Sequence, residues 1–412
     1  MIGRPAGSGA STLPVARTLT TYRAGILLLA AALLPGALQG QTATLSGYAL
    51  GMESHAGTST LTAGGRNFLR RIRIMPGLGW THLSVDAAGD FVVRNGGGFA
   101  FTGEAERSAF RGDWLDLDGT LWNGSGSVGT YRLDRLHATV DAGRVEVTVG
   151  RQPISWGTTL VLSVADPFSP FDPSDPFREY RTGVDAVRVR VFPGPFTEIE
   201  AVVRPVTTPS GSVLHTALLR GQTSLAGWAL GGWAGILHDE AAAAAFLSGS
   251  WGATAVRGEA SLRPHPRGGT AVRTALGVDR RFSPGGRDLY VILEYMHDGF
   301  GVGNVSNLLE LVYSKPFNRN EMQTMGSNVS VAQASLQLHP LVGVDALVLT
   351  NLNDGSALVG PGLTWSASGS ITLRIGAFAG TGADDTDPLT PSFASEYGAV
   401  PEIVYGSLSW YF

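Results

Sequence analysis

Charged side chains recur at every second position in several apolar stretches of the 412-residue sequence. Glu146 alternates with valines, and Arg188 and Arg190 do the same in the next such stretch. Successive side chains of a β-strand point to opposite faces, so this period places the charges on one face and aliphatic residues on the other. The residues in such positions are Glu146, Arg188, Arg190, Glu198, Glu200, Arg257, Glu259, Arg273, Glu294 and Arg374. Charges deep in strands fit the wet interior of a barrel better than a sandwich core, so we expect them to line a lumen. Cross-strand ion pairing is their first expected role, and solute selectivity is the second.

The most distinctive chemistry lies in the connection 158–182 and just before it. Prolines follow Asp166, Asp172 and Asp175, and proline stiffens the backbone and removes donors. The candidate constriction residues are Trp156, Asp166, Asp172, Asp175, Arg178, Glu179 and Arg181. One interpretation folds this connection into the lumen, where its opposite charges face each other across an opening. A second interpretation braces it outside as a rigid loop. A calcium site formed by the three aspartates is a third, but their spacing matches no EF-hand loop.

Signatures of enzymes and of bound cofactors are absent from the sequence. There is no cysteine, which excludes thiol nucleophiles, iron–sulfur clusters and Cys-ligated zinc. The sequence also lacks a G-x-S-x-G elbow, an H-E-x-x-H motif and a P-loop, and its eight histidines show no ligand spacing. The net charge of −4 provides no basic surface for nucleic acid. We therefore expect no enzymatic activity, cofactor, metal site or nucleic-acid partner.

The amino terminus has the layout of a secretory signal. Arginines precede the apolar stretch 24–38, and small residues follow it at the offsets that signal peptidase reads. A transmembrane anchor is the alternative, but the stretch is short and a Pro-Gly pair interrupts it. We expect cleavage between Gly40 and Gln41, so that 1–40 is a signal peptide and 41–412 is the mature domain.

Period-two alternation continues through the rest of the chain in segments of about ten residues. Short turns alternate with long polar or Gly/Pro-rich connections, which is typical of outer-membrane barrels. The pattern predicts an all-β fold, a transmembrane antiparallel β-barrel of about 18 strands (16–20), preceded by the cleaved signal peptide. The segment 110–122 could add a hairpin, and 305–313 fits a short helix in a loop.

The last predicted strand, 402–412, ends the chain on an aromatic residue. Its apolar face carries Val404, Leu408, Trp410 and Phe412. An alternating strand that ends on phenylalanine is similar to the signal read by the outer-membrane barrel assembly machinery. We expect these four residues to form that signal.

Three motifs together resemble a family of porin-like outer-membrane proteins of Gram-negative bacteria. They are G-R-Q-P-I-S-W-G at 150–157, the Asp-Pro-rich stretch 166–181 and G-V-D at 183–185. The turn 353–356, the Gly-Pro pair 360–361 and the aromatic end add to the resemblance. The resemblance implies a barrel with a passive transport role and implies no substrate.

The sequence therefore favours an outer-membrane channel for passive diffusion of small solutes, with 158–182 as its candidate constriction. One alternative is a substrate-specific channel for a hydrophobic compound or a polysaccharide. Another is a closed structural or adhesive barrel that binds partners through its long loops. The expected partners are outer-membrane lipid, the assembly machinery and small solutes, and a homo-oligomer is possible.

Overall fold

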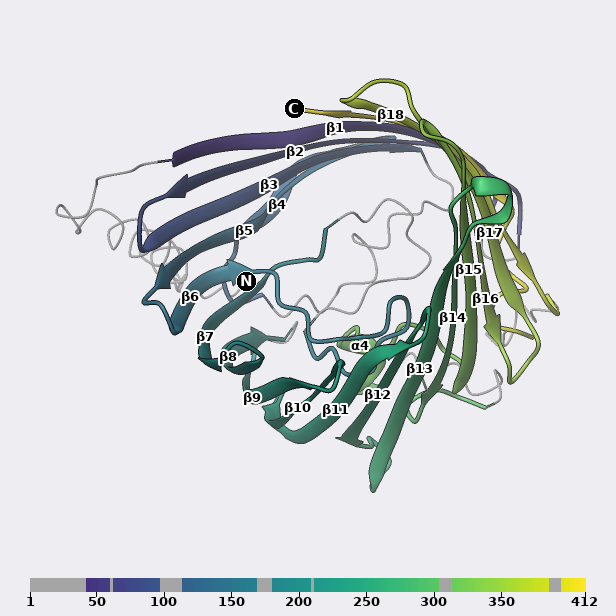
Figure 1. The fold of residues 1–412 in the computed structure, drawn as a ribbon. Coiled ribbons are helices and arrows are strands. Elements are labelled where there is room, and N and C mark those ends of the chain that lie inside the picture. The colour runs from purple at the N-terminus through teal and green to yellow at the C-terminus, as the bar shows by residue number, and fades with distance from the viewer. Residues whose placement is uncertain are drawn as a thin grey trace, which may run out of the picture.

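A computed structural model describes residues 42–59, 62–96, 113–168, 180–208, 211–303, 311, 313–384 and 394–412. The predicted signal peptide, 1–40, lies outside the described residues, and so does most of 305–313. The described residues form nineteen strands, shown in Figure 1: β1 (Thr42–Ala56), β2 (Gly65–Gly79), β3 (Leu83–Gly96), β4 (Asp118–Gly124), β5 (Ser127–Asp141), β6 (Val145–Gln152), β7 (Val184–Gly194), β8 (Thr197–Thr207), β9 (Val213–Leu225), β10 (Trp228–Leu237), β11 (Glu240–Trp251), β12 (Thr254–Pro264), β13 (Thr270–Phe282), β14 (Leu289–Asp298), β15 (Asn328–His339), β16 (Val342–Asn351), β17 (Ala357–Ser366), β18 (Ile371–Thr381) and β19 (Ile403–Tyr411).

Eighteen of these strands close into a ring. Each pairs antiparallel with its neighbour, and β19 pairs with β1 from Tyr48↔Tyr411 to Ala56↔Ile403. The strand β4 is not a member of the ring, because it pairs with the first half of β5 on the edge that β6 occupies further along. Because the ring is closed, none of its strands has an edge of unpaired backbone N–H and C=O groups. A sheet in hydrocarbon requires this.

The predicted fold class is therefore confirmed: the chain is a closed antiparallel barrel of 18 strands. The last predicted strand, 402–412, agrees with β19 to within one residue at each end. The sequence pattern allowed for an additional hairpin at 110–122. The short strand β4 begins in this segment and forms a hairpin with β5.

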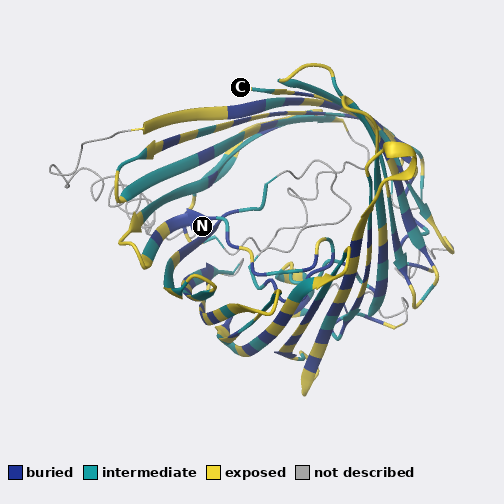
Figure 2. Ribbon diagram, in the orientation of Figure 1, coloured by how far each residue is buried: buried dark blue, intermediate teal, exposed yellow. Residues whose placement is uncertain are grey.

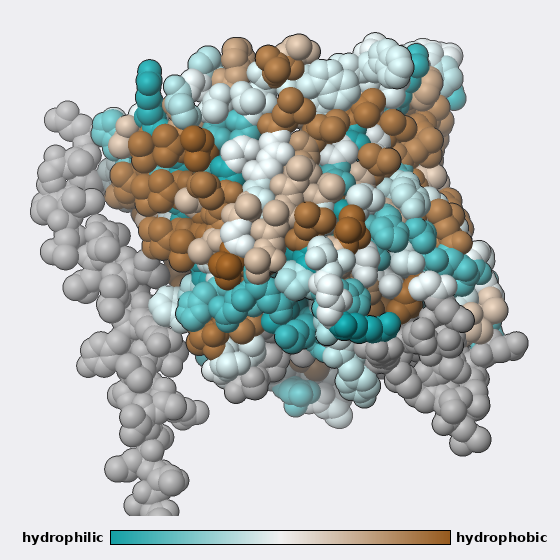
Figure 3. All heavy atoms as spheres, turned by 90° about the horizontal axis from the view of Figure 1, so that it is seen from below, coloured by the Kyte–Doolittle hydropathy of each residue, from teal (hydrophilic) through white to brown (hydrophobic). Residues whose placement is uncertain are grey.

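Side-chain burial alternates along the strands, as Figure 2 shows for β11, β12 and β13. In β2, Arg71 and Arg73 are buried on the inner face, whereas Ile72 and Ile74 are exposed on the outer face. Exposed apolar side chains gather in patches on the side of the outer wall seen in Figure 3, with more polar side chains between them. In the last strand and at the chain end, the exposed outer residues are Val404, Leu408, Trp410 and Phe412.

Within the part of the chain that the structure describes, the short helical segments η1 (Pro284–Gly286) and α4 (Lys315–Asn318) lie in connections. No helix among the described residues is long and apolar enough to cross a membrane. The two largest clusters of buried apolar residues lie where the connection after β6 packs against the inner wall. The interior of the barrel is therefore partly filled by its own chain (Figure 1).

Candidate functional site

The connection after β6 turns into the barrel as soon as the strand ends. Pro153 has no N–H and cannot continue the ladder, so β6 stops at Gln152. The following residues 153–168, here called the lumen segment, run inside the ring in Figure 1. Trp156 is 1% exposed and packs edge-on against Phe168, with ring centroids 4.8 Å apart. The start and the end of the lumen segment thus pack on each other.

Glu259 of β12 holds the lumen segment by its backbone. The side chain is buried, and both of its carboxylate oxygens accept hydrogen bonds. The donors are the N–H groups of Thr158, Thr159 (2.8 Å), Val164 (2.9 Å) and Ala165 (2.9 Å) and the hydroxyls of Thr158 (3.0 Å) and Ser163 (2.9 Å). A buried carboxylate is costly unless hydrogen bonds satisfy it, and here six donors surround it.

Glu294 of β14 holds the middle of the same segment. Its carboxylate accepts from three successive N–H groups, those of Leu160 (2.6 Å), Val161 (3.0 Å) and Leu162 (2.7 Å). Gly277 on β13 makes room, because a Cβ there would lie 3.1 Å from the Glu294 Cγ. Successive N–H groups that point to one anion form a concave binding site for it.

Further contacts complete the attachment of the lumen segment. The Gln323 side chain accepts from the Ser163 N–H (2.7 Å) and donates to the Val161 carbonyl (2.9 Å). Trp233 of β10 donates its indole N–H to the Ala165 carbonyl (2.7 Å). A Cβ at Gly157 would lie 2.2 Å from the Ser163 hydroxyl, so only glycine permits this close turn.

The two sequence motifs 150–157 and 183–185 contact each other where the lumen segment begins. Arg151 and Asp185 form a two-pronged ion pair with distances of 2.8 and 2.9 Å. Asp185 also accepts from the Trp114 and Leu115 N–H groups, both at 2.8 Å. This pair therefore ties the end of the β3–β4 connection to the barrel wall.

A second connection, the described residues 313–327, supports the lumen segment from the other side. Its Glu321 is buried and pairs with Arg263 (3.1 Å) and His238 (2.8 Å). Burial opposes ionisation of Glu321, but Arg263 and the hydrogen bond with His238 outweigh it and lower the pKa of this carboxyl to about 2. Glu396 then accepts from two N–H groups of 313–327 and links them to the connection after β18. Its own pKa is raised because burial opposes ionisation.

No protein-family model matches the sequence, and no curated protein matches it either. The barrel matches solved porin structures over nearly the whole chain. Pseudomonas aeruginosa OccK2 (OpdF), solved in complex with glucuronate, has a TM-score of 0.54 and 12% identity over 91% of this chain and 99% of that one. A BenF-like porin from Pseudomonas fluorescens Pf-5 has a TM-score of 0.55 and 11% identity over 92% and 100%. P. aeruginosa OpdK, solved with vanillate, has a TM-score of 0.53 and 12% identity over 92% and 100%.

The chain has the porin fold. At 10–12% identity, the similarity extends to the architecture of the barrel and to its strand count. In this structure the lumen segment lies inside the ring of strands. The contacts made by Glu259 and Glu294 are therefore central to the candidate site.

Most of the predicted lumen residues form ion pairs with neighbours in the barrel wall. Glu146 pairs with Arg190, Glu200 with Arg188 (2.5 Å) and Arg220 (3.5 Å), Glu198 with Arg220 (3.7 Å), Arg257 with Asp279 (3.0 Å), Arg273 with Asp298 (2.8 Å) and Arg374 with Asp345 (2.7 Å). For Glu259 and Glu294 the expected cross-strand pairing is wrong. The donors to these two carboxylates are N–H and hydroxyl groups of the lumen segment.

The predicted constriction residues divide into two groups. Asp172, Asp175, Arg178 and Glu179 lie outside the described residues. Trp156, Asp166 and Arg181 are described, and Asp166 pairs with Arg181 at the base of the connection. Trp156 and Asp166 are buried supports and do not face an opening. For the described part of the connection, the external brace is wrong, because residues 158–165 bond to the inner wall.

Sequence reasoning missed several residues that hold the site. Asp185 lay within the G-V-D motif, but its role as a double acceptor for the β3–β4 connection was not predicted. Trp233 was one of two tryptophans in β10, among small and aliphatic residues, and nothing in the sequence marked it as a donor to the lumen segment. Gln323 had no signal at all, since one polar residue in a long connection has no period or motif.

Proposed function

We propose that this chain is an outer-membrane channel through which small solutes diffuse passively, and that the lumen segment narrows its path. The observation that carries the proposal is the attachment of residues 158–165 to Glu259 and Glu294 inside a closed barrel. A barrel of this size is wide enough for an aqueous path unless something fills it. A fixed inward segment reduces that path to a selective opening.

The charged inner wall supports the same function. Rows of arginine and carboxylate side chains cross neighbouring strands, as in the register Glu146↔Arg190↔Glu200↔Arg220 from β6 to β9. Such rows tolerate water and offer hydrogen bonds to polar solutes. The exposed outer residues of the last strand and chain end are the proposed contact for the assembly machinery during insertion.

Selective passage of small carboxylic acids is the second candidate function. Two of the similar porins were solved with glucuronate and with vanillate, which are both small carboxylates. Arginine binds carboxylates through two parallel hydrogen bonds, and this chain has arginines along the inner wall. Glucuronate and vanillate are therefore the first solutes to test for this chain.

The test uses single-channel conductance in a planar bilayer together with thiol chemistry. Because the chain has no cysteine, a charged methanethiosulfonate reagent acts only at an introduced thiol. Leu160 of the lumen segment is 41% exposed, so the variant Leu160→Cys places a thiol at the proposed constriction. The control is Leu352→Cys, at an exposed residue (52%) between β16 and β17.

The expected result is a steady conductance that the reagent reduces in Leu160→Cys and leaves unchanged in Leu352→Cys and in the unmodified chain. Absence of conductance in all three proteins contradicts the channel and favours a closed barrel. Conductance that is insensitive to modification at Leu160 contradicts the constriction. Saturable block of the current by glucuronate or vanillate supports the second candidate function.

A further inference from the structure

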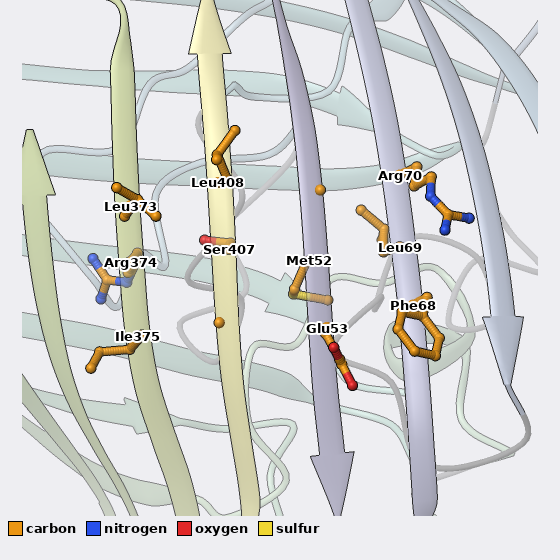
Figure 4. Close-up of a pocket in the computed structure, with 12 residues that line it drawn as sticks. Met52, Glu53, Phe68, Leu69, Arg70, Leu373, Arg374, Ile375, Ser407 and Leu408 are labelled. Carbon is orange, nitrogen blue, oxygen red and sulfur yellow. The ribbon is translucent and has the colours of Figure 1, made fainter. Parts of the chain in front are cut away.

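A groove runs over the outer wall where β18, β19, β1 and β2 lie side by side (Figure 4). Its volume is about 420 Å³. Gly51 and Gly406 form its floor, because both occupy outward positions and have no side chain. A Cβ at Gly51 would have no heavy atom within 4 Å, and one at Gly406 would meet only Ile375, at 3.9 Å. The groove is thus a hollow in the outer wall at the two glycines.

The sides of the groove are apolar and face outward. They are formed by Phe68 of β2, Leu408 of β19 and the β18 residues Leu373 and Ile375. Ile375 is 59% exposed and Leu408 is 46% exposed. An apolar hollow on a membrane-facing wall suits an alkyl chain, because the chain can fill the hollow and make van der Waals contact with its sides.

The side of the groove formed by β1 and β2 carries charged groups. Arg70 lies directly opposite Gly51 in the register and donates to Asn95 on the same outer face (3.3 Å). Glu53 lies directly opposite Gly406 and is 3.8 Å from Arg66, in a pair of well-exposed side chains. Two guanidinium groups and one carboxylate therefore lie along this side, and their summed charge is positive.

The position of Arg70 along its strand fits a membrane interface. It is five residues from Gly65, where β2 begins at the end of the barrel that carries the long connections. An arginine on the lipid face is unfavourable at the bilayer midplane and nearly neutral near the surface, where lipid phosphates lie. Arginine also binds phosphate through two parallel hydrogen bonds.

We infer that the groove is a binding site for one anionic, phosphate-bearing membrane lipid. An acyl chain of the lipid lies over Gly51 and Gly406, and its phosphate binds Arg70, with Arg66 adding positive charge. This inference rests on the proposed membrane setting of the barrel, and it is independent of conduction through the lumen. The site is distinct from ordinary lipid contact because it selects the headgroup.

The test is native mass spectrometry of the purified barrel with equal amounts of phosphatidic acid and phosphatidylcholine that share the same acyl chains. The wild-type barrel is expected to retain one phosphatidic acid, preferred about tenfold over phosphatidylcholine, because the phosphate of phosphatidylcholine carries less negative charge and is followed by a choline cation that the arginines repel. Arg70→Gln is expected to lose the preference and keep weak binding of both lipids. Gly51→Leu fills the groove and is expected to lose both.

The matched control is Gly221→Leu on β9, another outward glycine whose Cβ would meet no heavy atom within 4 Å. It is expected to retain lipid as the wild-type barrel does, and resistance to unfolding in dodecyl sulfate shows that each variant is folded. Equal retention of the two lipids by the wild-type barrel overturns the inference, as does unchanged retention by Gly51→Leu. A dimer that Gly51→Leu dissociates also overturns it and assigns the groove to a second copy. Conductance of the same preparations tests the channel separately.

Discussion

Replacement of Glu259 by glutamine provides the sharpest test of how the lumen segment is held. The substitution keeps the shape of the side chain and changes one acceptor oxygen into an NH2 donor. In the structure, each carboxylate oxygen of Glu259 accepts two backbone N–H bonds and one hydroxyl bond. Whichever way the new amide turns, its NH2 faces two backbone N–H groups that cannot turn away.

The magnitude follows from those two N–H groups. A buried donor that loses its acceptor costs about 1–3 kcal/mol, so Glu259→Gln destabilises the docked lumen segment by about 4 kcal/mol. Since about 1.4 kcal/mol is a tenfold change, the ratio of docked to undocked segment falls by about three orders of magnitude. The barrel itself keeps its ladders and stays folded, because Glu259 contributes its backbone to β12 as before.

The assay is single-channel recording of the wild-type barrel, Glu259→Gln and a control, Glu146→Gln. The control also removes a lumen carboxylate, but one that pairs with Arg190 in the wall. Glu259→Gln is expected to show a larger or strongly fluctuating conductance, and the control is expected to keep steady openings. If Glu259→Gln conducts with the same amplitude and noise as the wild-type barrel, the carboxylate does not hold the segment and the reasoning is refuted.

Three further predictions concern the same attachment. Gly157→Ala places a Cβ 2.2 Å from the Ser163 hydroxyl, so it is expected to raise current noise, measured against the wild-type barrel. Trp233→Phe removes the hydrogen bond to the Ala165 carbonyl and replaces the indole by a smaller aromatic ring, so thermal unfolding is expected to show a loss of at least about 1 kcal/mol, and no loss contradicts the role of this bond. The pKa of Glu321 lies at about 2, below its ordinary 4.5, so its ionised form stabilises the docked connection above pH 4.5 and this contribution, about 3 kcal/mol, is lost as the pH falls from 4.5 to 2. The protection of residues 313–327 against hydrogen exchange, taken relative to the intrinsic amide rate at each pH, is expected to fall over that range, and protection that does not change with pH contradicts the assignment.

The barrel was predictable because two solvents act on its strands. Lipid outside and water inside impose opposite polarity on alternate residues, so a single sequence shows the period of each strand. In β2, for example, Arg71 and Arg73 alternate with Ile72 and Ile74. The short strand β4 was harder to predict, because its residues are mostly exposed and carry no alternation to read.

The partners of the inward residues were not predictable in the same way. Periodicity indicates which face a side chain occupies, and it does not indicate what that side chain meets there. Glu198 and Glu259 show the same pattern in the sequence, yet the first meets an arginine of the neighbouring strand and the second meets backbone groups about 100 residues away. The motif 150–157 did point to the correct connection, since Arg151 and Gly157 shape its mouth and its first turn.

The mode of attachment has a consequence for how such a channel can change its selectivity. Glu259 and Glu294 bind backbone N–H groups of residues 158–165, so the attachment does not depend on most side chains of the segment. The side chain of Leu160 is 41% exposed, while its backbone N–H donates a hydrogen bond to Glu294. Substitutions at such positions can alter the opening while the segment stays attached. A single substitution of Gly157, Glu259 or Glu294 would instead weaken the attachment. A series of polar and charged residues at Leu160 is therefore expected to change which solutes pass while single-channel openings stay steady, and unsteady openings across that series contradict an attachment made mainly through the backbone.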